Sequence, residues 1–285
     1  MVHSGTLIRH ADFHSIYITP RNIDVWLPPG YDKAKKYPVI YMNDGQMLFD
    51  SSITWNKKEW GIDEEAGQLI EKGSIKPFIA VGIWNGGADR HREYLPQKPF
   101  NSLSASDRNK LISAGRTDGS PVFSADTILS DAYLLFLVNE LIPFINKEYS
   151  VSTKRQQTFI MGSSMGGLIS LYALCEYPQI FGGAACLSTH WPGIFSKENN
   201  PFPGSLFRYL ENKIPSPARH KIYFDRGTAT LDSLYADYQD TADSLFTKKG
   251  YTGSAYLSKI FKGEPHDENA WRKRIDHPLR FLLDR

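Results

Sequence analysis

Hydrophobic residues along the chain gather in short, almost continuous apolar runs separated by longer segments in which they recur at helical spacing. Runs of this kind, rich in β-branched and aromatic side chains, are typical of strands buried on both faces, as in a parallel sheet. Six runs fit this description: residues 37–42 (YPVIYM), 77–83 (PFIAVGI), 158–161 (TFIM), 182–187 (GGAACL), 221–224 (KIYF) and 255–261 (AYLSKIF). We therefore predict six strands, and we expect those at residues 37–42, 77–83 and 158–161 to be buried.

The segments between these runs have the spacing of helices. Helices are predicted over residues 58–72, 130–149, 168–177 and 233–249, with a further helix around Trp271. Pro143 is expected to kink the last turns of the second helix. Strands that alternate with helices predict a mostly parallel central sheet with helices on both faces, which is an α/β fold.

Two segments depart from this alternation. Residues 15–19 and 22–27 alternate polar with apolar positions and are separated by Pro20, which predicts an N-terminal antiparallel hairpin. Residues 90–122 are polar and rich in Ser, Gly and Pro. A loop this long usually has a function, and we expect it to form one wall of a binding site.

The composition is that of a globular chain. With 285 residues, 41% of them hydrophobic, the sequence has no repeat and no clear linker, so we predict one domain over residues 1–285. Cys175 and Cys186 lie in apolar segments. We expect two core residues rather than a disulfide or a metal pair.

Charge and hydropathy exclude several classes of partner. The chain has 33 basic and 31 acidic residues, a net charge of +2, which does not favour nucleic acid or an anionic membrane surface. No apolar run approaches the roughly 20 residues of a membrane span. The first residues, MVHSGTLIRHADF, lack the apolar segment of a signal peptide, which favours a cytoplasmic location.

One strand leads into a sequence that fits G-x-S-x-G. Residues 162–166 read GSSMG, with a predicted strand before them and a predicted helix after them. In this motif a serine occupies a tight strand-to-helix turn that exposes its Oγ, and the next N–H helps to bind an oxyanion. A glycine-rich loop is the alternative, but the strand and helix favour Ser164 as a nucleophile and the Met165 N–H as an oxyanion donor.

A second donor is expected just past another buried strand. Asp44 and Gly45 follow residues 37–42. This pair could form a hairpin turn, but no alternating strand comes after it. An oxyanion site needs a backbone N–H at this place. Gln46 is the candidate.

A serine nucleophile needs a base, and histidine is the usual one. Among the eight histidines, His266 follows the last predicted strand, so it comes after the serine and after an acid, in the α/β-hydrolase order Ser, Asp or Glu, His. His266, Asp267 and Glu268 could suggest a metal cluster, but adjacent side chains do not converge on one ion.

Two residues could be the acid that orients this histidine. Asp225 and Asp232 both follow the strand at residues 221–224. Asp225 could instead pair with Arg226 at the strand end. Asp232 could instead cap the following helix.

Several blocks of sequence resemble the esterase D-like family of α/β-hydrolase serine esterases, which includes siderophore and feruloyl esterases. The resemblance extends from about Val25 to Trp271. It depends on four blocks: VWLPPGYDKAKKYPVIYMNDGQMLFD, VGIWNGGADRHREYLP, FIMGSSMGGLISLYALCEYPQIFGGAACLS and GEPHDENAWRKRI. It implies an α/β-hydrolase fold and hydrolysis of a carboxylic ester without a cofactor or metal.

The resemblance also implies roles for single residues. It makes Ser164 the nucleophile, His266 the base, and the Gln46 and Met165 amides the oxyanion donors. The acid of the family normally follows a glycine a few residues beyond the strand, which favours Asp232. One departure is Asp44-Gly45, where many relatives have His-Gly. Only the backbone is needed at this place.

The expected substrate is a small-molecule or carbohydrate-linked ester. Trp84, Tyr94 and Trp191 lie in predicted loops and would suit an aryl or sugar-linked acyl group. Two alternatives are acyl transfer to a sugar or thiol, which would use the same triad, and a binding protein with a degenerate site. The complete Ser, Asp and His set favours an enzyme over the second.

Overall fold

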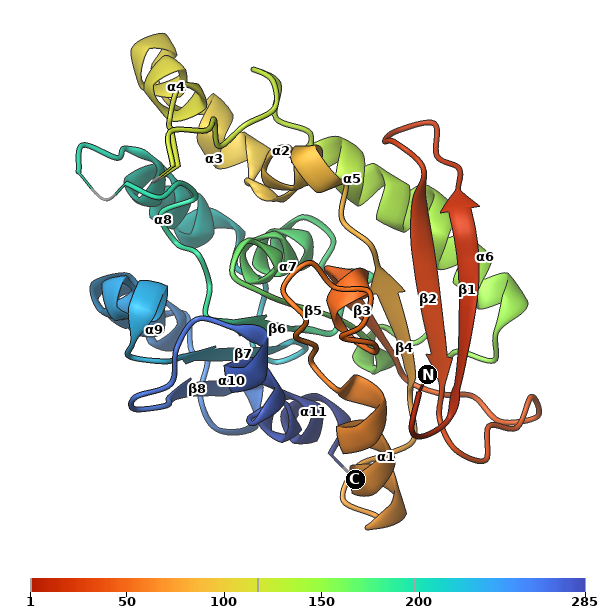
Figure 1. The fold of residues 1–285 in the computed structure, drawn as a ribbon. Helices are drawn as coiled ribbons and strands as arrows, with labels where there is room; N and C mark the ends of the chain where they lie inside the picture. Colours follow the sequence, from red (N-terminus) through yellow and green to blue (C-terminus); the bar gives the residue numbers. More distant parts are fainter. Residues whose placement is uncertain (1, 117, 197, 285) are drawn as a thin grey trace.

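The computed structural model describes residues 2–116, 118–196 and 198–284. Its strands are β1 Thr6–Phe13, β2 Arg21–Leu27, β3 Val39–Asn43, β4 Ile79–Ile83, β5 Thr158–Ser163, β6 Gly183–Leu187, β7 Lys221–Arg226 and β8 Tyr256–Ile260. They form one eight-stranded sheet in the order β1-β2-β4-β3-β5-β6-β7-β8 (Figure 1). The pairs β1–β2 and β2–β4 are antiparallel, and all other pairs are parallel. The predicted mostly parallel sheet with an N-terminal hairpin is therefore present.

Helices cover both faces of this sheet. They are α1 Ile62–Glu71, α2 Arg90–Tyr94, α3 Gln97–Asn101, α4 Ala105–Ile112, α5 Ser130–Phe136, α6 Ile142–Glu148, α7 Met165–Glu176, α8 Phe202–Lys213, α9 Ala236–Lys248, α10 Glu268–Arg272 and α11 Asp276–Leu283. Along β3, Val39 and Tyr41 join one hydrophobic core, whereas Ile40 and Met42 join the other. The first core includes α5 and α7, and the second includes α1 and α11. Figure 1 shows these two pairs of helices on opposite sides of the sheet.

The register of the parallel strands brings their carboxyl ends to one edge. Met42 lies opposite Met161, Ser163 opposite Leu187, and Leu187 opposite Asp225. In open α/β sheets, ligands bind beyond this edge. The connections that follow β3, β5, β6 and β7 therefore meet where a site is expected.

The hairpin uses different residues from those predicted. Its first strand is β1, and residues 14–20 form the connection instead of a strand. Within that connection the Ser15 Oγ accepts hydrogen bonds from the Tyr17 and Ile18 N–H groups, at 3.0 and 3.3 Å. These bonds close a turn, so the strand predicted over residues 15–19 is wrong.

The long polar segment is also more regular than predicted. Residues 90–122 contain the three short helices α2, α3 and α4 instead of forming a plain loop. The Ser104 Oγ caps α4 by accepting a hydrogen bond from the Asp107 N–H at 3.1 Å. Half of the residues of α4 are exposed and only Leu111 is buried, and such a helix lacks the apolar periodicity from which helices are predicted.

Pro143 lies inside a continuous helical segment. A π-helical turn, Leu137–Leu141, joins α5 to α6, and Pro143 is in the first turn of α6. The wider turn before the proline is where such a segment accommodates the missing N–H. Cys175 and Cys186 are buried and unbridged, as predicted. No helix within the described ranges combines the length and the apolar character that a bilayer crossing requires.

Candidate active site

Ser164 occupies a strained turn between β5 and α7. Its backbone angles are φ 56° and ψ −123°, a region that residues with a Cβ rarely occupy. Strand and helix cross closely here, because an ideal Cβ added to Gly162 would lie 2.5 Å from the carbonyl carbon of Gly166. The Ser164 N–H donates to the Leu187 carbonyl at 2.9 Å, which fixes the turn against β6. The residues of the G-x-S-x-G motif thus form the strand–turn–helix arrangement that this motif requires.

Ser164 and His266 line the same pocket, which has a volume of about 490 Å³. His266 reaches it from the connection between β8 and α10. The histidine ring lies edge-on to Trp271, with 5.1 Å between ring centroids, and edge-on to Tyr235 at 5.7 Å. These aromatic contacts limit the orientations that the imidazole can adopt.

The Asp232 carboxylate contacts one ring nitrogen of His266. The His266 Nδ1 lies 2.5 Å from the Asp232 Oδ1, and Asp232 is fully buried. The second oxygen, Oδ2, accepts from the Gly227 N–H at 2.5 Å and from the Ser188 Oγ at 2.6 Å. Burial alone would raise the pKa of the Asp232 carboxyl, but the hydrogen bonds from His266, Ser188 and Gly227 outweigh it and lower the pKa. The carboxyl therefore stays ionised at neutral pH.

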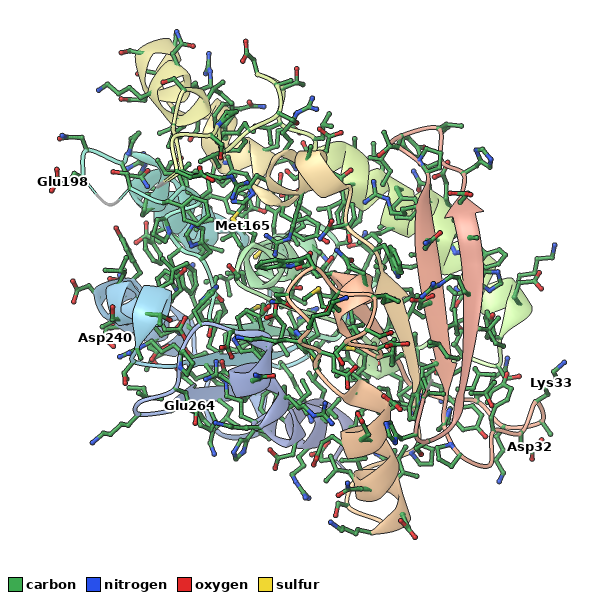
Figure 2. All side chains as sticks on the ribbon, in the orientation of Figure 1. Asp32, Lys33, Met165, Glu198, Asp240 and Glu264 are labelled. Atoms are coloured by element: carbon green, nitrogen blue, oxygen red, sulfur yellow. The ribbon has the colours of Figure 1, made fainter. Side chains whose placement is uncertain are left out.

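The loops that carry this acid and this base are hydrogen-bonded to each other. The Thr228 and Ala229 N–H groups donate to the Glu264 carbonyl at 3.1 and 3.2 Å. The His266 N–H donates to the Thr230 Oγ1 at 2.8 Å. Glu264, labelled in Figure 2, lies on the loop that leads to α10. A Cβ on Gly227 would lie 2.0 Å from the Glu264 carbonyl oxygen, so the approach of the two loops requires glycine here.

Asp225, the other acid considered from the sequence, faces different partners. Its Oδ1 lies 3.0 Å from the Arg274 Nη2, and its Oδ2 accepts from the Tyr223 hydroxyl at 2.9 Å. Burial raises the pKa of the Asp225 carboxyl to about 6, with Arg274 opposing the rise. The expected pairing with Arg226 is wrong, because the Arg226 guanidinium donates to the Gly227 carbonyl at 3.2 Å. Of the two acids, the one beside His266 is Asp232.

Sequence reasoning missed Ser188, which follows β6 directly. Its Oγ donates to the Asp232 Oδ2, and it accepts from the Trp271 Nε1 at 3.0 Å and from the Arg274 Nη2 at 2.8 Å. Its position just beyond a small-residue strand, at the carboxyl edge of the sheet, was the available signal. The hydroxyl joins Asp232 to the buried Arg274 and orients the carboxylate.

The two proposed oxyanion amides each lie in the first turn of a helical segment. Met165 is the first residue of α7, where N–H groups have no intrahelical acceptor. Its side chain is buried, and Figure 2 labels it at α7. Gln46 lies in a 3₁₀ turn, Gly45–Met47, directly after β3. Gln46 lines the pocket together with Ser164, and its Oε1 accepts from the Asn85 N–H at 3.2 Å.

The aromatic residues that line the pocket differ from those predicted. Trp84 points to the hairpin, where its Nε1 donates to the Asp24 Oδ2 at 2.8 Å. Tyr94 and Trp191 are fully buried. The pocket is lined instead by Trp55, Trp60 and Trp271, and Trp55 is 84% exposed. The prediction was wrong because a position in a loop does not tell which way a side chain points.

The acidic residues after His266 have separate partners. The Asp267 carboxylate lies 2.8 Å from the Lys58 Nζ and also caps α10. The Glu268 Oε2 accepts from the Asn56 Nδ2 at 2.8 Å. These contacts tie the segment carrying Trp55 to the segment that follows His266.

Several known proteins similar to this chain are named as esterases. A chain of Bacillus subtilis strain 168, named uncharacterized protein YbbA, is 27% identical over 92% of both chains. Ferri-bacillibactin esterase BesA of the same organism is 27% identical over 58% of this chain and 53% of its own length. Among solved structures, a ferulic acid esterase aligns with a TM-score of 0.66 and 18% identity over 98% of both chains. This likeness confirms the α/β-hydrolase fold.

A family model that matches most of the chain shows which family it belongs to. The model of the esterase family described as "Putative esterase" matches residues 17–111 and 115–282. It thus covers most of the chain, including the elbow serine and the loops with Asp232 and His266. The chain belongs to this esterase family, and the carboxylic-ester hydrolase predicted from its sequence is confirmed.

Proposed function

We propose that the chain hydrolyses its ester through a Ser164–His266–Asp232 triad, with an acyl-enzyme intermediate. The observation that carries this proposal is the 2.5 Å contact between His266 and Asp232 in a pocket that Ser164 also lines. The base and the acid are already oriented, and the nucleophile lies on a turn that exposes its hydroxyl.

The reaction has two halves. The Ser164 Oγ attacks the acyl carbon while the His266 Nε2 takes its proton, and the Asp232 carboxylate accepts the Nδ1–H and stabilises the imidazolium. The alcohol then leaves with the proton from His266. Water attacks the acyl-enzyme in the same way and releases the carboxylic acid. No cofactor takes part in any of these steps.

The oxyanion of each tetrahedral intermediate accepts hydrogen bonds from the Gln46 and Met165 N–H groups. A donor of this kind is worth about 3 kcal/mol of barrier. The positive end of α7 lies at Met165 and adds to the stabilisation. The tight elbow and the 3₁₀ turn after β3 support this assignment, since both present N–H groups at the start of a turn.

The substrate that we propose is a small-molecule or carbohydrate-linked ester. Trp55, Trp60 and Trp271 supply flat apolar surfaces, and Lys58 and Arg90 add charge to the pocket lining. Aryl and sugar groups fit such a mixed surface better than a long fatty acyl chain. The names of the relatives, a ferri-bacillibactin esterase and a ferulic acid esterase, agree with this range.

A panel of esters tests the substrate proposal. It contains p-nitrophenyl acyl esters, methyl ferulate, acetylated xylan, S-formylglutathione and a catecholate trilactone, each assayed for acid release. We expect hydrolysis of an aryl or sugar-linked member to exceed that of long-chain p-nitrophenyl esters. Products carrying the acyl group on an added sugar or thiol, in place of free acid, would identify an acyltransferase.

The pH profile of the reaction tests the assignment of the base. We expect kcat/KM to rise with pH, because only a neutral imidazole can accept the serine proton. Burial lowers the pKa of His91 to about 2 and that of His190 to about 3, so neither changes charge between pH 5 and 8. Rates from pH 5 to 8 measure the profile, and His266→Ala is the control that loses it. A flat profile with chemistry rate-limiting would contradict the assignment of the base.

Gly45→Ala tests the turn that carries Gln46. A Cβ on Gly45 would lie 2.4 Å from the Gly82 carbonyl carbon and 2.6 Å from the Ile83 nitrogen. Because β4 cannot yield, the turn must move, and we expect kcat to fall together with a loss of about 1–3 kcal/mol of stability. Gly204→Ala is the matched control, since its nearest neighbour, the Arg208 Nη1, is 3.6 Å away. Parent kcat in Gly45→Ala would argue against the role of this turn.

A further inference from the structure

A carboxylate lies beside the proposed oxyanion site, at a place where negative charge opposes the reaction. Asp44 comes two residues before Gln46, in a left-handed conformation with φ 59° and ψ 46°. Its carboxylate also lies against the first turn of α7, because a Cβ on Gly166 would be 3.1 Å from the Asp44 Oδ2. Asp44 is thus next to both proposed donors, Gln46 and Met165.

Arg90 holds this carboxylate with two parallel hydrogen bonds. The Arg90 Nε lies 2.6 Å from the Asp44 Oδ1, and the Nη2 lies 2.7 Å from the Oδ2. Asn85 adds a neutral bond to Oδ1 at 2.7 Å. The side chain of Asp44 is 10% exposed and that of Arg90 is 24% exposed, so water screens the pair only in part. Arg90 is the cation that makes an ion pair with Asp44.

For the reaction, the location of the Asp44–Arg90 ion pair matters more than the strength of the pair. During acyl transfer, a negative charge develops on the carbonyl oxygen, and the positive end of α7 and two N–H groups are there to stabilise it. An unpaired Asp44 carboxylate against the first turn of α7 would cancel part of this stabilisation. Arg90 lines the pocket with Ser164, so its positive charge lies on the side where the oxyanion forms.

We infer that Arg90 is a positioning residue that neutralises the Asp44 carboxylate and thereby keeps the oxyanion site electropositive. The inference rests on the proposed function, because it needs an oxyanion at this site. Arg90 acts on the reaction through Asp44 and not through a bond to the substrate. The two partners therefore have unequal effects, since loss of the cation leaves a harmful charge and loss of the anion does not.

Four variants separate charge from geometry. Arg90→Gln leaves the carboxylate unpaired, and we expect kcat to fall by about 10- to 100-fold, somewhat less than the loss of a whole oxyanion donor, with KM within about threefold. Arg90→Lys keeps the charge and retains most of kcat. Asp44→Asn removes the carboxylate itself, and we expect its kcat to fall less than that of Arg90→Gln. The double variant Asp44→Asn/Arg90→Gln regains most of the rate lost in Arg90→Gln.

A transition-state analogue gives a second readout that folding does not affect. A trifluoromethyl ketone forms a tetrahedral anion on Ser164, so its inhibition constant in Arg90→Gln rises in proportion to the fall in kcat. Binding of the neutral substrate does not change in the same way. Thermal unfolding of each variant identifies any that fail to fold, and Arg90→Lys then decides the result.

Arg9 supplies a matched control. Its guanidinium makes the same two-bond contact with Asp24, at 2.7 and 2.9 Å, but it does not line the pocket with Ser164. Arg9→Gln therefore removes an equivalent ion pair and is expected to keep kcat.

The inference is overturned if Arg90→Gln keeps its kcat, if only KM changes, if Arg90→Lys is as slow as Arg90→Gln, or if the double variant shows no recovery. Ser164→Ala is assayed in parallel. If it retains turnover, the proposed function fails. If it is inactive while Arg90→Gln is not impaired, only this inference fails.

Discussion

Ser164→Ala is expected to abolish ester turnover and labelling by a fluorophosphonate while leaving the fold intact. Removing a triad serine lowers kcat by about 10⁶-fold, because the members of a triad act as a unit. The backbone of the elbow is held by the Ser164 N–H bond to Leu187 and by the glycines around it, not by the hydroxyl. The melting temperature should therefore stay close to that of the parent.

The adjacent serine provides the control. Ser163 is buried at the end of β5, and we expect Ser163→Ala to keep its labelling by the fluorophosphonate. Labelling followed by mass spectrometry of the tryptic peptide identifies the modified residue. Turnover retained in Ser164→Ala, or label found on another serine, would refute the assignment of the nucleophile.

Asp232→Asn is expected to lower kcat by about 10⁴-fold with little change in folding. The amide has nearly the same shape as the carboxylate, but its NH₂ group favours the wrong tautomer of His266 and does not stabilise the imidazolium. The Gly227 N–H and the Ser188 hydroxyl still find an oxygen to donate to. The loss should appear in kcat and not in the melting temperature.

Asp225→Asn is the matched comparison, with the opposite expected result. Breaking the buried contact with Arg274 leaves its guanidinium with the Asp232 carboxylate alone, at 3.9 Å. Removing one partner of a buried pair costs up to about 3–5 kcal/mol. We therefore expect a lower melting temperature and a smaller effect on kcat. If the variants behave in the reverse way, Asp225 is the acid that serves His266.

The features predicted best from the sequence are those that depend only on residues close together in the chain. The strand before Ser164, the turn and the helix after it are contiguous, so a local motif is enough to find them. Buried parallel strands such as β3 and β5 were found because both of their faces are apolar, although their ends shifted by one or two residues. Helix α4 was missed because it has few buried apolar residues and therefore no apolar periodicity.

Contacts between distant residues could not be predicted in the same way. Ser188, Asp232 and Arg274 meet although they lie far apart along the chain. Nothing in the local sequence distinguished Asp232 from Asp225, and only the family resemblance favoured one of them. The hydrogen bond between Asp232 and His266 distinguishes the two acids. This bond depends on where both loops run in space, which the local sequence does not give.

The hydrogen bonds between the acid loop and the base loop have a consequence for enzyme engineering. Thr228 and Thr230 bind the Glu264 carbonyl and the His266 N–H, so the two loops form one preassembled module. Trp55 belongs to neither loop and is open to solvent. We therefore expect libraries of variants at Trp55 to change the ester preference without displacing the proposed triad, whereas an insertion in either loop of the module would displace the proposed acid and base together.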